Sequence, residues 1–282
     1  MKRRAGVLGQ PIGHSLSPAL HNAGYAAAGL ADWTYTAHEC AEADLTEFVA
    51  GLGPEWVGLS LTMPLKEVAL AVADEVAPPA AAIGAANTLV RQPDGRWRAE
   101  NTDAPGMVDA LAGVGLTTAG RVAVLGAGGT ARAALAAARD LGARSVTVYA
   151  RRPEAIEPLR AVAANLALPM DGGRWADVAG AGQADLVVAT VPAGVADPLA
   201  ATMRWRSGGV LLDAIYDPWP TPLAAAAARA GVAIVSGLEL LLAQAVRQFV
   251  RFTGMAAPVA AMRAALPSRY AGRPAMSHRE GG

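Results

Sequence analysis

A turn of small residues, Gly126-Ala127-Gly128-Gly129-Thr130-Ala131, constrains the fold of this chain more than any other feature. It follows an apolar segment, residues 122–125, and opens an alanine-rich stretch, residues 130–141. Between a strand and a helix, the first glycine permits a tight turn and the second lets the backbone approach a pyrophosphate. A small third residue lets the helix pack on the strand. The helix N-terminus then offers free N–H groups to phosphates, so the pattern favours a nucleotide-binding turn over a purely structural one.

Apolar segments alternate with alanine-rich stretches along most of the chain, which predicts parallel sheets of the α/β class. We expect strands at residues 5–8, 57–61, 88–90, 122–125, 146–149, 186–189, 210–213 and 232–235. We expect helices at residues 18–28, 64–71, 105–112, 130–141, 223–230 and 239–252. Residues 121–237 therefore resemble one complete dinucleotide-binding unit, and residues 267–282, which include His278, are expected to form a flexible tail.

Composition excludes several classes of protein. Hydrophobic residues make up 53% of the 282 residues, which excludes a disordered chain and predicts about two domains. The 24 Lys+Arg balance the 24 Asp+Glu, which argues against binding nucleic acid through bulk phosphate attraction. The most apolar stretch, residues 223–243, is broken by Arg229, Gly231 and Glu239, so we expect no membrane contact. The single Cys40 and the absence of a secretion signal predict a cytoplasmic protein.

The end of the second strand in this unit indicates which dinucleotide binds. Arg151 and Arg152 stand where an enzyme that uses NAD places an Asp or Glu for the ribose hydroxyls. A carboxylate would repel a 2′-phosphate, whereas a guanidinium binds it through charge-assisted hydrogen bonds. The sequence therefore favours NADP, the alternative being that both arginines are solvated surface charges.

Four short polar motifs precede this unit. The first runs from His14 through Ser15 and Ser17 to Pro18, and it predicts Ser17 as an N-cap before a first-turn proline. Two hydroxyls at a helix N-terminus also suit a carboxylate ligand. The third and fourth motifs, residues 86–89 and 101–103, put Asn and Asp at strand ends, where α/β sheets form ligand crevices. These residues are also ordinary turn formers.

The second motif, Ser60-Leu-Thr62-Met-Pro64-Leu-Lys66, contains one of only two lysines in the chain. Pro64 is expected to begin a helix, which puts Lys66 in its first turn, where the helix dipole disfavours a cation by about 0.3–1 kcal/mol. That placement indicates that the ammonium is needed there, against the alternative of a solvated lysine. With Asp103 it supplies an ammonium–carboxylate pair suited to proton transfer.

Taken in order, these motifs are similar to those of shikimate dehydrogenases over residues 5–266. The resemblance rests on the four polar motifs, the glycine turn, Asp213-Ala-Ile-Tyr216 with Thr221-Pro222, and Gly237 followed by Gln244-Ala245. It implies reversible NADPH-dependent reduction of 3-dehydroshikimate to shikimate, on the chorismate route to aromatic amino acids. It also implies a substrate domain of residues 1–103 and 238–266, a Rossmann NADP-binding domain of residues 104–237, and a cleft between them.

The resemblance implies a role for each motif residue, beginning with Lys66 and Asp103 as the catalytic pair. The implied substrate-binding residues are Ser15, Ser17, Ser60, Thr62, Lys66, Asn87, Asp103, Tyr216 and Gln244. The implied cofactor-binding residues are Gly126, Ala127, Gly128, Gly129, Thr130, Ala131, Arg151, Arg152, Thr190, Ala214 and Gly237. Ser60 replaces the family's usual asparagine, so that contact is expected to be shorter or water-bridged. Residues 150–152 keep one arginine of the family's Asn-Arg-Thr.

Three alternative functions fit parts of the same pattern. One is a relative that prefers quinate or an aminated shikimate, with NAD as cofactor. Another is a methylene-tetrahydrofolate dehydrogenase, which the paired serines disfavour, and the third is a non-catalytic NADP sensor, against which the Lys66–Asp103 pair argues. We expect a small-molecule substrate, a monomer or homodimer, and no metal, since the histidines and the cysteine lack ligand spacing. We also expect the two domains to close on their ligands.

Overall fold

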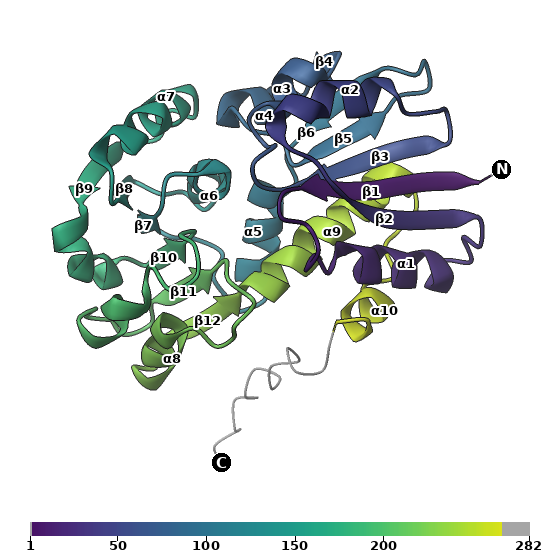
Figure 1. The fold of residues 1–282 in the computed structure, drawn as a ribbon. Coiled ribbons are helices and arrows are strands. Elements are labelled where there is room, and N and C mark those ends of the chain that lie inside the picture. Colours follow the sequence, from purple (N-terminus) through teal and green to yellow (C-terminus); the bar gives the residue numbers. More distant parts are fainter. Residues whose placement is uncertain (1, 267–282) are drawn as a thin grey trace.

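Two six-stranded sheets, linked by helices, form the computed structural model, which describes residues 2–266 (Figure 1). The first sheet has the strand order β2-β1-β3-β5-β6-β4 and the second β12-β11-β10-β7-β8-β9. The first sheet consists of β1 (Arg3–Gly9), β2 (Trp33–Glu39), β3 (Trp56–Leu61), β4 (Glu75–Val76), β5 (Thr88–Arg91) and β6 (Trp97–Glu100). The second consists of β7 (Arg121–Leu125), β8 (Ser145–Ala150), β9 (Met170–Arg174), β10 (Leu186–Ala189), β11 (Val210–Asp213) and β12 (Ala233–Ser236).

The second sheet is entirely parallel, as expected of a dinucleotide-binding unit. Its strand order reverses between β7 and β10, so the carboxyl ends of these two strands flank a crevice of the kind in which α/β sheets bind ligands. The turn after β7 is the glycine turn that opens α6 (Gly129–Asp140). The predicted α/β class and the predicted strands of this unit are confirmed, with bounds that differ by one residue at most.

The first sheet is mixed, and the expectation of a parallel sheet is wrong there. Strands β1, β2 and β3 are parallel, but β5 runs antiparallel to both β3 and β6. A tight turn at residues 92–95 joins β5 to β6, and Gly95 adopts φ 87° to close it. A hairpin connection of this length forces antiparallel pairing.

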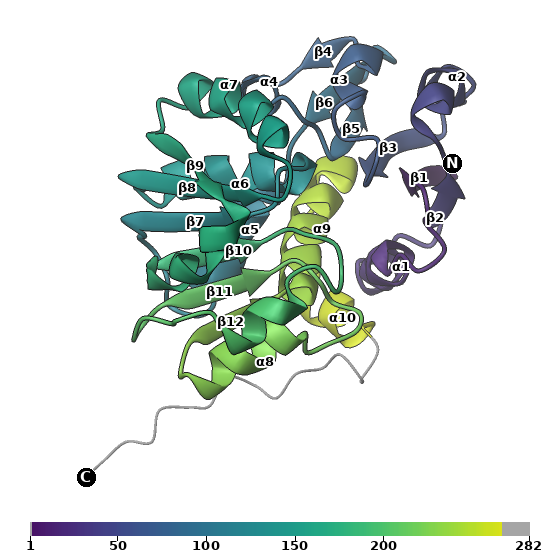
Figure 2. The ribbon, with the colours of Figure 1, turned by 60° about the vertical axis from the view of Figure 1, so that its left-hand side comes forward.

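The longest helix, α9 (Gly237–Thr253), lies between the two sheets (Figures 1 and 2). It follows β12 directly and packs against α5 (Asp103–Ala112), α1 (Ser17–Ala27), β3 and β5. At its far end Phe252 lies so close to Gly58 that any side chain at that position would clash with the ring. The other helices are α2 (Leu45–Ala50), α3 (Ala69–Val72), α4 (Pro78–Ile83), α7 (Glu157–Asn165), α8 (Pro222–Arg229) and α10 (Val259–Ala264). Within residues 2–266, four 3-10 helices lie at Glu42–Asp44, Pro153–Ile156, Trp175–Gln183 and Asp197–Ala201.

Two local predictions at helix starts are wrong. Residues 63–68 form turns and α3 begins only at Ala69, because the Lys66 carbonyl accepts a hydrogen bond from the Ala86 N–H at 2.7 Å instead of one from a helix. Lys66 is therefore held outside a helix, and the dipole argument does not apply to it. Ser17 is the first residue of α1 and Leu16 takes the cap position, so Ser17 is not the N-cap.

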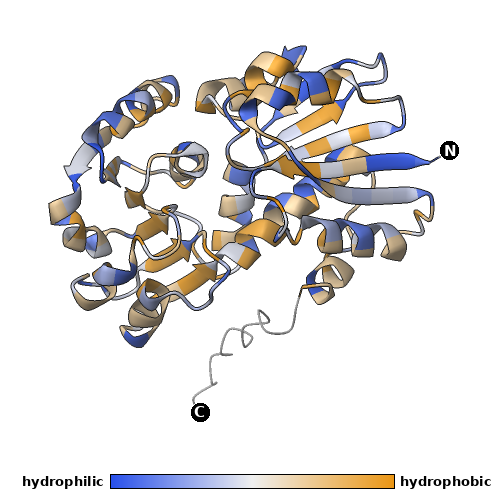
Figure 3. Cartoon of the chain, viewed as in Figure 1, coloured by the Kyte–Doolittle hydropathy of each residue, from blue (hydrophilic) through white to orange (hydrophobic). Residues whose placement is uncertain are grey.

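Apolar side chains fill the space between sheets and helices, and strands β10, β11 and β12 are mostly hydrophobic in Figure 3. Every residue of β10 and β11 is buried, since helices or loops cover both faces of this sheet. The predicted tail at residues 267–282, including His278, lies outside the described residues. Within residues 2–266, no helix is long and apolar enough to span a bilayer.

A fully buried histidine, His21 of α1, lies in the core beside the first sheet. Its ring stacks on Tyr35 with the centroids 4.1 Å apart and the planes at 2°. Neither ring nitrogen makes a hydrogen bond of standard geometry within the described residues, although Gln248 lies close enough to influence the ring. Burial lowers the pKa of His21 to about 3, and the Gln248 side chain offsets only part of this effect.

We expect His21 to make the protein sensitive to acid. Below a pH of about 6.5 the unfolded chain binds a proton at His21 that the folded chain does not, so stability falls by up to about 1.4 kcal/mol per pH unit until the folded pKa near 3. His21→Phe removes this loss. Denaturant titrations of both proteins between about pH 7 and pH 4 measure this effect. The free energy of unfolding of the variant, relative to that of the wild type, should increase as the pH falls. A difference that is independent of pH would contradict the assignment.

Candidate functional site

A cavity of about 300 Å³ lies where the carboxyl-terminal ends of strands from both sheets meet. Its walls include the segments that follow β1, β3 and β11, together with the first turns of α1, α5, α6 and α9. All nine residues expected to bind substrate line it: Ser15, Ser17, Ser60, Thr62, Lys66, Asn87, Asp103, Tyr216 and Gln244. Of the residues expected to bind cofactor, three reach it: Thr130, Ala214 and Gly237. The structure therefore brings together side chains separated by more than two hundred residues.

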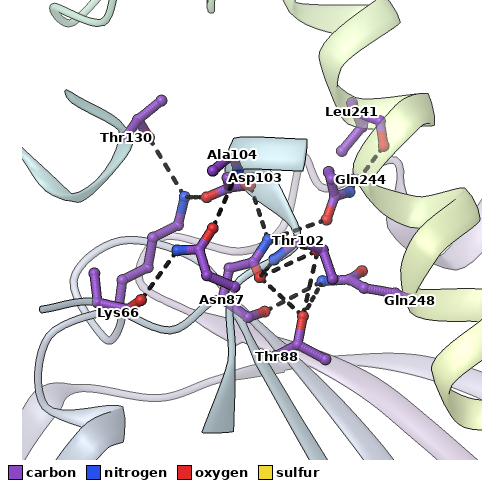
Figure 4. Close-up of polar contacts among 12 residues, drawn as sticks. Lys66, Asn87, Thr88, Thr102, Asp103, Ala104, Thr130, Leu241, Gln244 and Gln248 are labelled. Carbon is purple, nitrogen blue, oxygen red and sulfur yellow. Dashed lines mark hydrogen bonds and ion pairs between the residues drawn. The ribbon is translucent and has the colours of Figure 1, made fainter. Parts of the chain in front are cut away.

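An ion pair between Lys66 and Asp103 lies in the wall of this cavity. Lys66 Nζ is 2.6 Å from Asp103 Oδ2 and 3.4 Å from Thr130 Oγ1 (Figure 4). The two paired side chains are only 15% and 8% exposed, so water screens the pair weakly. An ammonium fixed in this way can donate a proton to a ligand oxygen while the carboxylate holds both groups in place.

Asn87 fixes the orientation of that carboxylate. The Thr102 N–H can only donate, and it lies 2.7 Å from Asn87 Oδ1, so the Asn87 amide nitrogen must face the other way. That nitrogen donates to Asp103 Oδ1 at 2.8 Å. Asn101 Oδ1 accepts the Ala104 N–H at 3.1 Å, which holds the first turn of α5. Both oxygens of Asp103 therefore have a donor, and the carboxylate lies at a helix N-terminus, where the dipole favours negative charge.

Ser15 and Ser17, at the start of α1, and Thr62, directly after β3, line the cavity. The Ser17 N–H donates to Ser15 Oγ at 3.4 Å. Thr62 is held by its backbone, since its N–H donates to the Leu8 carbonyl at 2.9 Å. Three hydroxyl groups around one space can bind the oxygens of a small polar acid.

A buried carboxylate, Asp213, shapes the loop that carries Tyr216. Thr221 Oγ1 donates to Asp213 Oδ2 at 2.7 Å, and the Ile215 N–H donates to Oδ1 at 3.2 Å. Thr221 also caps α8 by accepting the Ala224 N–H at 3.0 Å. Burial raises the pKa of Asp213, and these hydrogen bonds oppose the shift. The Asp213-to-Thr221 motif therefore has a structural role, which is to direct Tyr216 toward the cavity.

The glycine turn has room for a ligand. Gly126 has φ 115°, and any Cβ there would collide with Thr190, whose hydroxyl donates to the Leu125 carbonyl at 3.0 Å. A Cβ on Gly128 would meet open space, so the backbone is accessible at the start of α6. Ala131 is fully buried, as helix-on-strand packing requires. A Cβ on Gly129 would lie 3.3 Å from Lys66 Cβ, so this turn also borders the ion pair.

Arg151 and Arg152 follow β8 directly and are both exposed. Neither guanidinium makes a hydrogen bond or ion pair within residues 2–266, which leaves both available to an anion beside the glycine turn. In the same part of the chain, no group of three or more His, Cys, Asp or Glu side chains is arranged to hold a metal ion.

Three further residues of the site were not predicted from the sequence. His14 and Gln248 line the cavity, and Tyr35 contacts Ser60 from behind it. Gln248 follows Gln244 by four residues on α9, so helical spacing alone places both on one face, and this was the signal available. Tyr35 lies in β2, which was not predicted, so the sequence offered no signal for it.

Two family models match the chain. The one described as the shikimate dehydrogenase substrate binding domain matches residues 7–89, and the one described as the shikimate 5'-dehydrogenase C-terminal domain matches residues 237–266. A shikimate dehydrogenase (NADP(+)) of Moorella thermoacetica is 37% identical over 269 residues, which are 91% of this chain and 90% of that protein. The chain belongs to the shikimate dehydrogenase family.

Solved structures of shikimate dehydrogenases share the fold. The enzyme from Mycobacterium tuberculosis superposes with a TM-score of 0.86 at 47% identity, over 94% of this chain and 98% of that one. Shikimate 5-dehydrogenase from Thermus thermophilus, solved in complex with NADP(H) and shikimate, superposes with a TM-score of 0.81 at 33% identity. It covers 93% of this chain and 98% of that one. The expected resemblance and two-part α/β architecture are therefore confirmed.

Proposed function

We infer that this chain is an NADP-dependent shikimate dehydrogenase, which reversibly reduces 3-dehydroshikimate to shikimate on the chorismate route to aromatic amino acids. The observation that carries the inference is the shielded Lys66–Asp103 pair, in a cavity next to the glycine turn. Its relatives of 35–40% identity are named shikimate dehydrogenase (NADP(+)). The names of these relatives favour the shikimate reaction over the quinate and aminoshikimate alternatives, and the Lys66–Asp103 pair argues against a non-catalytic sensor.

The residues around the glycine turn fit NADP. The pyrophosphate would lie against Gly126–Ala131, where Gly128 leaves space and the N–H groups of α6 are free. Arg151 and Arg152 would bind the 2′-phosphate through charge-assisted hydrogen bonds. Thr190, Ala214 and Gly237 would contact the nicotinamide half. When bound, NADPH supplies the hydride for the reduction.

In the proposed mechanism, the protein supplies the proton and the orientation. Lys66 Nζ donates a proton to the ring oxygen as negative charge develops on it. Asp103 accepts hydrogen bonds from the ammonium and from the substrate, so that both are held at one point. In the reverse direction the same lysine takes the proton back.

The remaining cavity groups would bind the rest of the ring. Ser15 and Ser17 are proposed to bind the carboxylate, next to the N-terminus of α1. Thr62, Asn87, Tyr216 and Gln244 are proposed to bind the ring hydroxyls, together with Ser60.

We propose a substrate domain of residues 1–103 and 238–266 and an NADP domain of residues 104–237, which close on their ligands. The two separate sheets support this division. Side-chain contacts across it near the cavity include Lys66 with Thr130 and Glu67 with Arg132, whose Oε2 and Nη2 are 2.8 Å apart. Glu67 is 53% exposed, and an ion pair with one exposed partner contributes at most about 1 kcal/mol, so breaking this pair costs little.

We propose that the protein works in the cytoplasm as a monomer or homodimer, without nucleic acid or membrane partners. A single buried cysteine, Cys40, suits a reducing compartment. Formal charge neutrality gives no general attraction to nucleic acid.

Turnover of shikimate and quinate with NADP+ and with NAD+ tests the proposed function. We expect the largest kcat/KM for shikimate with NADP+, since the arginines after β8 favour a 2′-phosphate. Absorbance of the reduced nicotinamide measures all four combinations in one assay. A larger kcat/KM for quinate, or for NAD+, would replace the assignment with one of its alternatives.

Lys66→Met should lower kcat by at least about 100-fold, because it removes the proton donor, and should leave NADPH affinity close to that of the wild type. The matched control is Lys2→Met, which changes the only other lysine, an exposed residue. Steady-state rates and NADPH titrations measure both effects. A Lys66→Met enzyme with nearly normal kcat would remove Lys66 from the mechanism.

A further inference from the structure

Behind the cavity runs a row of buried polar side chains, of which only Ser60 has a role in the function proposed above. Tyr35 Oη lies 2.6 Å from Ser60 Oγ, and Ser60 Oγ lies 2.7 Å from Gln248 Oε1. Gln248 Nε2 lies 3.0 Å from Thr88 Oγ1 and 3.2 Å from the Asn87 main-chain carbonyl (Figure 4). None of these four side chains is more than 4% exposed. Ser60 and Gln248 also line the cavity, so the row connects its wall to the core.

Hydrogen-bond chemistry fixes the direction of every bond in this row. The Asn87 carbonyl can only accept, so the amide nitrogen of Gln248 must face it and the amide oxygen must face Ser60. That oxygen can only accept as well, so Ser60 donates its single hydrogen to Gln248. Tyr35 must then donate to Ser60.

Tyr35 is held firmly in the position to do so. The Asn22 side chain bonds its backbone twice, accepting from the Tyr35 N–H and donating to the Tyr35 carbonyl, both at 2.9 Å. His21 stacks on its ring. Burial raises the pKa of the Tyr35 hydroxyl, which therefore remains a donor.

A hydroxyl has one hydrogen and two lone pairs. Ser60 uses its hydrogen on Gln248 and one lone pair on Tyr35, so a single lone pair is all it can offer the cavity. We propose that Gln248 is a positioning residue that makes Ser60 a pure acceptor, so that the substrate must carry a hydrogen-bond donor, a hydroxyl or an amine, at the ring position facing Ser60. This proposal rests on the proposed function and adds a selection rule to it.

Analogues of shikimate test the rule. At C4 and at C5, the ring positions whose hydroxyls do not react, the hydroxyl is replaced by hydrogen or by fluorine. At the position that faces Ser60, hydrogen should lower kcat/KM about fivefold to tenfold, because one hydrogen bond is lost. Fluorine should lower it by at least about threefold more, because it brings a second acceptor against the Ser60 lone pair. The variant Ser60→Ala shows which ring position faces Ser60. Its kcat/KM should fall for shikimate, but not for the analogue that carries hydrogen at the position facing residue 60.

Two variants of the row separate the rule from a general loss of packing. In Gln248→Met the Ser60 hydrogen is free to turn toward the cavity. The kcat/KM for the fluorine analogue should therefore equal or exceed that for the hydrogen analogue. The variant Tyr35→Phe removes a hydrogen bond that is buried to a similar extent, but Ser60 still donates to Gln248. The kcat/KM should therefore remain higher for the hydrogen analogue than for the fluorine analogue, as in the wild type. If Gln248 had a purely structural role, kcat/KM would change to a similar extent in both variants. The hydrogen analogue would then remain the better substrate in both.

The wild-type enzyme alone decides the outcome if Gln248→Met does not fold. If the wild type turns over shikimate but has the same kcat/KM for the fluorine and hydrogen analogues at both ring positions, the proposal is overturned. An unchanged ranking in folded Gln248→Met also overturns it. Absence of shikimate turnover would instead overturn the proposed function, and this inference with it.

Discussion

An ammonium and a carboxylate 2.6 Å apart, both largely hidden from water, determine how the rest of the site must be built. Taking two charges out of water costs several kcal/mol each, and their attraction offsets this only when the other polar atoms are also satisfied. Asp103 accepts a hydrogen bond from Lys66 and a second one from the Asn87 amide nitrogen. The Thr102 N–H fixes the orientation of the Asn87 amide. Since such a pair adds little net stability, its presence in a cavity wall is best explained by chemistry.

The two sheets serve this pair in different ways. The mixed first sheet supplies Lys66 and Asp103 after the carboxyl ends of β3 and β6. It supplies Asn87 before the amino end of β5, which lies at the same edge because β5 is antiparallel to both. The parallel second sheet brings the glycine turn so close to Lys66 that a Cβ on Gly129 would lie 3.3 Å from the lysine side chain. Helix α9 connects them, because it starts at Gly237 beside Ala214 and extends along the first sheet to Phe252. Movement of one sheet relative to the other would therefore change the surroundings of the reacting groups.

Much of this could be predicted from sequence where burial determines the pattern. Strands β10 and β11 are continuous apolar runs, covered on both faces, and their predicted bounds match those observed. Strand β9, with the sequence MDGGR, has no such signal and forms only because it pairs with β8 at the edge of the sheet. Lys66 was expected in a helix, but a long-range bond to Ala86 holds it in a turn. The row from Tyr35 to Gln248 joins residues more than two hundred positions apart, and no local pattern predicts such a contact.

A crystal structure of the wild-type protein with NADP+ and shikimate bound would show whether Lys66 and Asp103 meet the reacting oxygen of the substrate. We expect a single ring oxygen to lie within about 2.6–3.2 Å of both Lys66 Nζ and an oxygen of Asp103, on the side that faces the nicotinamide. A ring bound with that oxygen out of reach of the lysine, or turned away from the nicotinamide, would contradict it.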